Sequence, residues 1–263
     1  MKPACLLVLS LTLFVANSAV ADDALVRWSE PAKQLDYASL EKSMPKDLEE
    51  PLLSFMAQEL KPEVKTQLDL RIEISEKPFG YYDREEKRIF VPLANVYRIY
   101  DDLRAKYPEQ EEVTDAILHT TLQFYLLSEL IRAITEELEL RISGWEAEKV
   151  DALATVLLLE SLIVDQAYTL DAAEEYLLID RASGSIQAAQ FKTEFEADEY
   201  RLTQILCITE AYDSEQAAEP PSSDRVCKGQ YEAAMSFWSQ TFADNLKPGG
   251  RLQQWLDQTK RVD

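Results

Sequence analysis

The chain has 263 residues, with 48 aspartates and glutamates against 27 lysines and arginines and a formal net charge of −21. A protein this acidic repels nucleic-acid phosphates and anionic membrane surfaces, so the composition argues against nucleic-acid binding. Only 6 glycines are present, and because strong helix formers are abundant, we expect a mostly helical protein.

The first 21 residues have the composition of a secretory signal peptide. Lys2 supplies the positive charge at the start, residues 4–16 are mostly apolar, and Ala19-Val20-Ala21 places small residues at the two positions that a signal peptidase reads. The apolar run is too short to cross a bilayer as a helix, and no other stretch approaches 18 apolar residues. We therefore expect an exported protein, periplasmic or secreted, with residues 22–263 as a single domain and no integral membrane segment after cleavage.

Two segments show the pattern of β-strands. From residue 68 to residue 74, apolar residues alternate with Asp69, Arg71 and Glu73, which is the period of a half-buried strand. Residues 79–83 indicate a turn, and residues 88–91 indicate a returning strand that stops at Pro92.

Helical periodicity dominates the rest of the chain. A break at Ser143-Gly144 separates two long and strongly apolar helices. In chain order, the predicted helices cover residues 94–107, 114–138, 145–164, 170–179, 198–212, 225–243 and 251–260. The fold class that we predict is α+β, predominantly helical, with a small β-sheet.

Two cysteines, Cys207 and Cys227, remain once the signal peptide with Cys5 has been removed. Two cysteines in an oxidising compartment most simply form one disulfide. The alternative, a pair of thiols that binds a metal, lacks a third cysteine or a histidine nearby in the sequence.

The strongest functional pattern lies in the middle of the chain. Residues 124–132, Phe-Tyr-Leu-Leu-Ser-Glu-Leu-Ile-Arg, belong to the first long helix, and residues 144–151, Gly-Trp-Glu-Ala-Glu-Lys-Val-Asp, open the next. Two antiparallel helices with a short polar connection form an αα-hairpin, so the two segments can face each other.

This arrangement resembles a bacterial family of exported metallopeptidases of otherwise unknown function. The pattern of that family is His-Glu-x-x-His on one helix, after two apolar residues and one variable residue, and Gly-Arg-Glu-Glu-x-Ala-Ala-Asp on the next. Residues 79–89, before this helix pair, also resemble a turn and strand of that family, and residues 198–207 and 225–238 resemble its later segments, in the same order along the chain. The resemblance implies a zincin-like core, in which a small β-sheet packs on an active-site-type helix pair, with zinc as the cofactor.

The zinc ligands of that family are replaced in this chain. The two histidines of the motif lie on one helix face and hold the metal, and the glutamate between them acts as a base on the metal-bound water. Here Ser128 and Arg132 stand at the two ligand positions, while Glu129 keeps the position of the base. In related zinc peptidases the third ligand is a glutamate four residues before a supporting aspartate, and counting back from Asp151 reaches Ala147. The resemblance therefore implies that all three zinc ligands are absent.

Arg132 opposes zinc binding most strongly, because a guanidinium keeps its proton in proteins and cannot ligate a metal. We expect Arg132 to replace the charge of the metal by pairing with Glu129, or with Glu146 across the hairpin. We also expect Ser128 to hydrogen-bond with Asp151, where the family has a histidine and its supporting aspartate. The alternative is that these residues simply face solvent.

The single histidine, His119, cannot complete this site from the same helix. It precedes Ser128 by nine residues, which places it about 180° away around a continuous helix. A Ser-His-Asp triad would have to use the same histidine, and no P-loop, dinucleotide-binding or calcium-loop motif is present.

The sequence thus predicts an exported and catalytically inactive metallopeptidase-like protein, a pseudo-peptidase with a binding or scaffolding role in the cell envelope. Its partner would be a peptide or an envelope protein, since zincins bind a peptide as an added strand at the sheet edge. One alternative is a structural protein whose former cleft is filled. The other is a divergent metal-dependent hydrolase with carboxylate ligands around Mg²⁺, Ca²⁺ or Mn²⁺, from Glu129, Glu146, Glu148 and Asp151.

Overall fold

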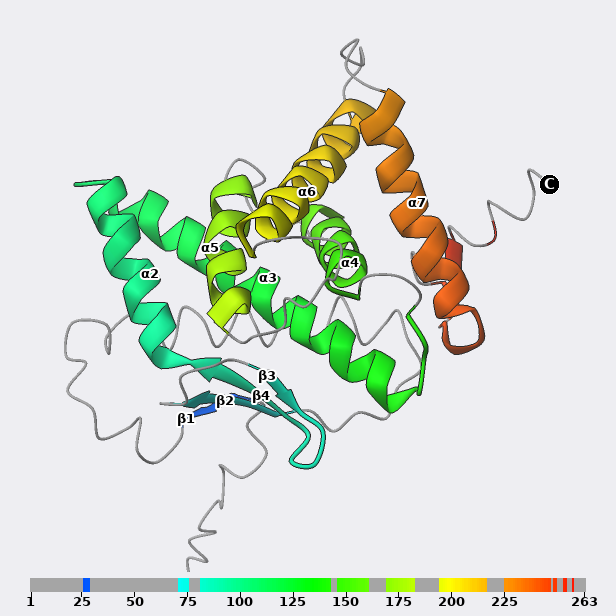
Figure 1. Ribbon diagram of the computed structural model, residues 1–263, viewed down its shortest axis with the longest axis horizontal. Coiled ribbons are helices and arrows are strands. Elements are labelled where there is room, and N and C mark those ends of the chain that lie inside the picture. Colours follow the sequence, from blue (N-terminus) through cyan, green and yellow to red (C-terminus); the bar gives the residue numbers. More distant parts are fainter. Residues whose placement is uncertain are drawn as a thin grey trace, which may run out of the picture.

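The computed structural model describes residues 26–28, 71–75, 81–142, 146–160, 169–182, 194–216 and 225–246, together with 248–249, 253–254 and 257. Within these ranges, a small four-stranded sheet lies at one side of a larger group of helices (Figure 1). The prediction of a predominantly helical fold with a small sheet is confirmed. The expected signal peptide, residues 1–21, lies outside the described residues.

The sheet has the strand order β1-β2-β4-β3. Strands β1, β2 and β4 run parallel, and β3 is antiparallel to β4. The strands cover Val26–Trp28 (β1), Arg71–Ser75 (β2), Tyr81–Asp83 (β3) and Arg88–Pro92 (β4). The predicted strand 68–74 is confirmed in its described part, from residue 71, and the predicted strand 88–91 is confirmed as β4, but β4 returns from β3 and runs parallel to β2.

Residues 81–83, which the sequence indicated as part of a turn, form strand β3 instead. The turn lies one step later, at residues 84–87. Asp83 defines it, because its Oδ1 accepts the backbone N–H groups of Glu85 at 2.9 Å and Glu86 at 3.0 Å. An aspartate whose side chain accepts the backbone N–H groups two and three residues later favours such a turn. Because the turn begins after Asp83, Tyr81 and Tyr82 lie before it and pair with β4.

The helices follow the predicted order, and within the described residues their ends lie within a few residues of the prediction. They cover Leu93–Lys106 (α2), Glu111–Glu137 (α3), Glu146–Glu160 (α4), Thr169–Ala182 (α5), Glu194–Gln216 (α6) and Arg225–Thr241 (α7), followed by a short 3₁₀ turn at Ala243–Asn245. Most of the predicted helix 251–260 lies outside the described residues. None of the helices in the described part of the chain is long and apolar enough to span a bilayer.

Helix α3 is the centre of the fold. Every residue from 120 to 131 is buried, because α2, α4 and α5 pack around α3 and strands β3 and β4 cover another part of it (Figure 1). A helix that is covered on all sides is expected to be apolar all round. Tyr125 fixes α3 to the sheet, since its hydroxyl donates to the carbonyl of Phe90 in β4 at 2.7 Å.

The predicted disulfide between Cys207 and Cys227 is confirmed, and it joins α6 to α7. A second contact attaches α7 to the helix pair of the candidate site. The indole N–H of Trp238, a completely buried residue of α7, donates to the carbonyl of Lys149 in α4 at 2.8 Å. The position of α7 therefore depends both on the crosslink and on α4.

Removing the disulfide should destabilise this arrangement. The double variant Cys207→Ala/Cys227→Ala is expected to lose about 3 kcal/mol of unfolding free energy, the entropy of closing a loop of about 20 residues. Urea unfolding in the absence of reductant measures the loss. Leu206→Ala is the matched control, because Leu206 is an exposed side chain of α6 and its truncation is expected to change stability by less than about 0.5 kcal/mol. A double variant as stable as this control would contradict the prediction.

Candidate functional site

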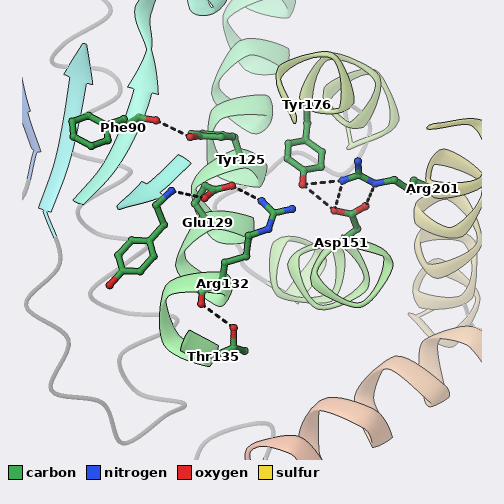
Figure 2. Close-up of polar contacts among 9 residues, drawn as sticks. Phe90, Tyr125, Glu129, Arg132, Thr135, Asp151, Tyr176 and Arg201 are labelled. Carbon is green, nitrogen blue, oxygen red and sulfur yellow. Dashed lines mark hydrogen bonds and ion pairs between the residues drawn. The ribbon is translucent and has the colours of Figure 1, made fainter. Parts of the chain in front are cut away.

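Glu129, which the family resemblance places at the position of the catalytic base, has both carboxylate oxygens engaged. The residue is only 4% exposed. Its Oε2 accepts the backbone N–H of Tyr82 in β3 at 2.8 Å. Its Oε1 forms an ion pair with the guanidinium of Arg132, one turn later on α3 (Figure 2).

The ion pair lies in a largely dry environment. The side chain of Glu129 is 5% exposed and that of Arg132 is 16% exposed. An ionised carboxylate at such a place is costly unless a cation and hydrogen-bond donors surround it, and here Arg132 and the N–H of Tyr82 provide both. Arg132 thus pairs with Glu129, one of the two partners that the sequence suggested, while the other, Glu146, is exposed at the start of α4.

The two other positions at which the resemblance places zinc ligands hold small buried residues. Ser128 is completely buried and Ala147 is 5% exposed. The hydroxyl of Ser128 has no hydrogen-bond partner among the described residues. By contrast, Thr120 and Thr121 on the same helix donate to the carbonyls four residues earlier, at 2.9 and 2.8 Å. The predicted hydrogen bond between Ser128 and Asp151 is therefore wrong.

Asp151 instead belongs to a second buried ion pair, which sequence reasoning did not single out. Its Oδ2 accepts Nε of Arg201 at 2.5 Å, and its Oδ1 accepts Nη2 of the same guanidinium at 2.9 Å. The hydroxyl of Tyr176 donates to Oδ1 at 2.9 Å and accepts Nη2 of Arg201 at 3.2 Å. Paired hydrogen bonds of this kind are among the stronger polar contacts in proteins.

The three members of this cluster come from α4, α5 and α6 (Figure 2). All are essentially excluded from solvent, with Asp151 and Arg201 each 1% exposed and Tyr176 fully buried. No local signal in the sequence indicates this burial, because Arg201 follows the acidic residues Asp198 and Glu199 and resembles an ordinary surface cation of a predicted helix. The alternative that the site residues face solvent is wrong for Ser128, Glu129 and Asp151.

The side chains present do not fit a catalytic zinc ion. Zinc requires three or more nitrogen, sulfur or carboxylate ligands from the protein, and the three positions at which the resemblance places the ligands hold a hydroxyl, a guanidinium and a methyl group. The oxygens of Glu129 and Asp151 already face cationic donors. Across the described residues, no three side chains of His, Cys, Asp or Glu are grouped so that they could hold a metal ion.

The carboxylates of the alternative hydrolase are likewise divided between separate contacts. Glu129 pairs with Arg132 and Asp151 with Arg201. Glu148 accepts the hydroxyl of Tyr200 in α6 at 3.3 Å. The geometry therefore offers no observation in favour of a hard-cation site at this helix pair.

Residues 30–242 match a protein-family model, a range that includes the helix pair, the buried Asp151–Arg201 pair and the disulfide. Comparison with curated proteins and comparison with solved structures each returned no match. Because the matched range covers well over half of the chain, this protein belongs to the family described as "Putative metallopeptidase".

Proposed function

We propose that this protein is an exported, catalytically inactive metallopeptidase-like protein with a binding or scaffolding role in the cell envelope. The observation that carries the proposal is the Glu129–Arg132 ion pair. A general base must be free to take a proton from the attacking water, but both oxygens of Glu129 accept hydrogen bonds from the protein itself. Arg132 stands where the family motif has a zinc ligand, and it neutralises the base.

Two further observations support a zincin-like core as part of this proposal. Helices α3 and α4 pack against each other, as an active-site helix pair requires. Strands β3 and β4 lie on α3 at the level of the motif, because Tyr82 and Phe90 bond to Glu129 and Tyr125 respectively. The arrangement of sheet over motif helix is the one that the family resemblance leads us to expect.

Export is supported by the composition of residues 1–21 and by the Cys207–Cys227 disulfide. Structural disulfides persist in oxidising compartments such as the periplasm or the extracellular space. The partner that fits an envelope protein of this kind is a peptide or another envelope protein.

Metal analysis of the purified native protein tests the proposal directly. We expect no stoichiometric zinc after dialysis against a zinc-containing buffer, and no chelator-sensitive hydrolysis of a denatured protein substrate. Stoichiometric zinc together with such hydrolysis would refute the proposal.

Restoring the ligands provides the matched comparison. The triple variant Ser128→His/Arg132→His/Ala147→Glu is expected to bind about one zinc ion per chain, because it supplies the three ligands that a catalytic zinc site uses. The double variant Ser128→His/Ala147→Glu keeps the guanidinium of Arg132, and we expect it to bind none. Equal zinc binding by both variants would show that Arg132 does not exclude the metal.

A further inference from the structure

Tyr82 provides the outward-facing backbone N–H of strand β3. Among the described strands, β3 lies at the edge of the sheet, with β4 on one side only. Tyr82 is opposite Ile89, between the pairs Tyr81–Phe90 and Asp83–Arg88. In an antiparallel ladder, residues alternately direct their N–H and C=O groups toward the partner strand and away from it. Since the N–H of Tyr82 donates to Glu129 and not to β4, Tyr82 is the residue of Tyr81–Asp83 whose backbone N–H is directed away from β4, toward the open edge of the sheet.

An added strand binds a sheet edge through such outward backbone groups. We infer that Glu129 caps the edge of β3: its carboxylate takes the N–H that an added peptide strand would need, and Arg132 holds the carboxylate in place. This inference rests on the proposed function, in which Glu129 no longer acts on a metal-bound water. It assigns Glu129 the role of closing β3 to strand addition.

The cap is built into the docking of α3 on the sheet. Tyr125 and Glu129 lie four residues apart, so they project from the same face of α3. Tyr125 bonds to the carbonyl of Phe90 in β4 at 2.7 Å, and Glu129 bonds to the N–H of Tyr82 in β3 at 2.8 Å. Two successive turns of one helix therefore hold both strands of the hairpin (Figure 2).

Burial keeps the capping carboxylate at this place. Glu129 is 4% exposed, so leaving Tyr82 would place a charged oxygen in an apolar environment instead of in water. Arg132 adds a second restraint on the other oxygen. A peptide strand that approached β3 would have to displace this charged contact, and the binding role proposed above consequently uses a different surface from the peptide edge expected of a zincin-like core.

Hydrogen exchange of the Tyr82 amide, followed by NMR of the full chain, tests the cap. In Glu129→Ala we expect this amide to exchange at least about tenfold faster relative to the buried amides of α3, because a hydrogen bond to a charged acceptor is lost. Tyr125→Phe is the matched control: it removes another side-chain bond between α3 and the hairpin but leaves Glu129 in place. Its Tyr82 amide should keep the exchange rate of the native protein relative to α3.

A second variant covers the case in which Glu129→Ala does not fold. Glu129→Gln keeps an oxygen that accepts from Tyr82 but loses the charge and the pairing with Arg132, so we expect exchange at Tyr82 between the native and the alanine rates. An unchanged Tyr82 rate in both variants would overturn the cap.

Sedimentation velocity tests whether the cap closes the strand. An uncapped edge strand pairs readily with another copy, so Glu129→Ala should self-associate more than the native protein and than Tyr125→Phe at equal concentration. Faster exchange at Tyr82 without added self-association would overturn the closing role. Zinc binding and hydrolysis by the native protein would refute the proposed function without altering these exchange rates, so the two ideas fail separately.

Discussion

Replacing Arg201 with alanine is expected to lower the free energy of unfolding by about 3–5 kcal/mol, because it leaves the carboxylate of Asp151 buried without its cation. The side chains of Arg201 and Asp151 are 0% and 2% exposed, so water cannot replace the lost partner. For a domain of this size the loss corresponds to a melting temperature lower by roughly 10 °C. Calorimetry and urea unfolding measure it.

An exposed ion pair is the matched control for Arg201→Ala. Arg98 and Asp102 lie 3.9 Å apart on α2, with side chains that are 44% and 60% exposed, and Arg98→Ala should cost less than about 0.5 kcal/mol. Adding Asp151→Asn to Arg201→Ala should recover part of the loss, since a neutral amide costs less to bury than a charge. If Arg201→Ala cost no more than Arg98→Ala, the cluster would not stabilise the fold as we argue.

Replacing Arg132 with alanine is expected to cost about 2–3 kcal/mol, less than Arg201→Ala because the guanidinium of Arg132 is not fully desolvated. The loss arises at Glu129, which keeps the N–H of Tyr82 but loses the guanidinium of Arg132. The melting temperature of Arg132→Ala, compared with the native protein at neutral pH, measures the effect.

A double-mutant cycle separates the ion pair from other losses of packing. If the pair is the cause, Glu129→Gln/Arg132→Ala should be more stable than the sum of the two single variants predicts. Arg132→Lys should lose less than Arg132→Ala, because it keeps the charge although it lacks the planar guanidinium. Strict additivity of the two single changes would show that Glu129 and Arg132 do not stabilise each other.

Contacts between residues close in the sequence were open to prediction. The pairing of Glu129 with Arg132 links positions three apart on one helix, and helical geometry alone makes such positions neighbours. The disulfide followed from the number of cysteines left after export. The long apolar pattern around Tyr125 likewise predicted α3, because a buried helix of this length has a strong periodic signal.

Contacts between distant residues were not open to prediction. Asp151 pairs with Arg201, which lies fifty residues later on α6. The residues around Asp151 in the sequence do not indicate whether its side chain bonds to Arg201 or to Ser128, the partner that we predicted. Strand β3 has only three residues, too few for an alternating pattern to separate it from the turn at Asp83. The parallel pairing of β2 with β4 depends on β3 taking the other side of β4, which is a property of the whole sheet.

The cluster of Asp151, Tyr176 and Arg201 also makes the helical part of the molecule cooperative. Each of its three members belongs to a different helix, so α6 cannot separate from α4 and α5 without leaving a bare charge inside the core. Regions that cannot open separately exchange their amides through one common unfolding event. Because the crosslink at Cys207 and Cys227 attaches α7 to α6, the four helices α4, α5, α6 and α7 should share that single opening.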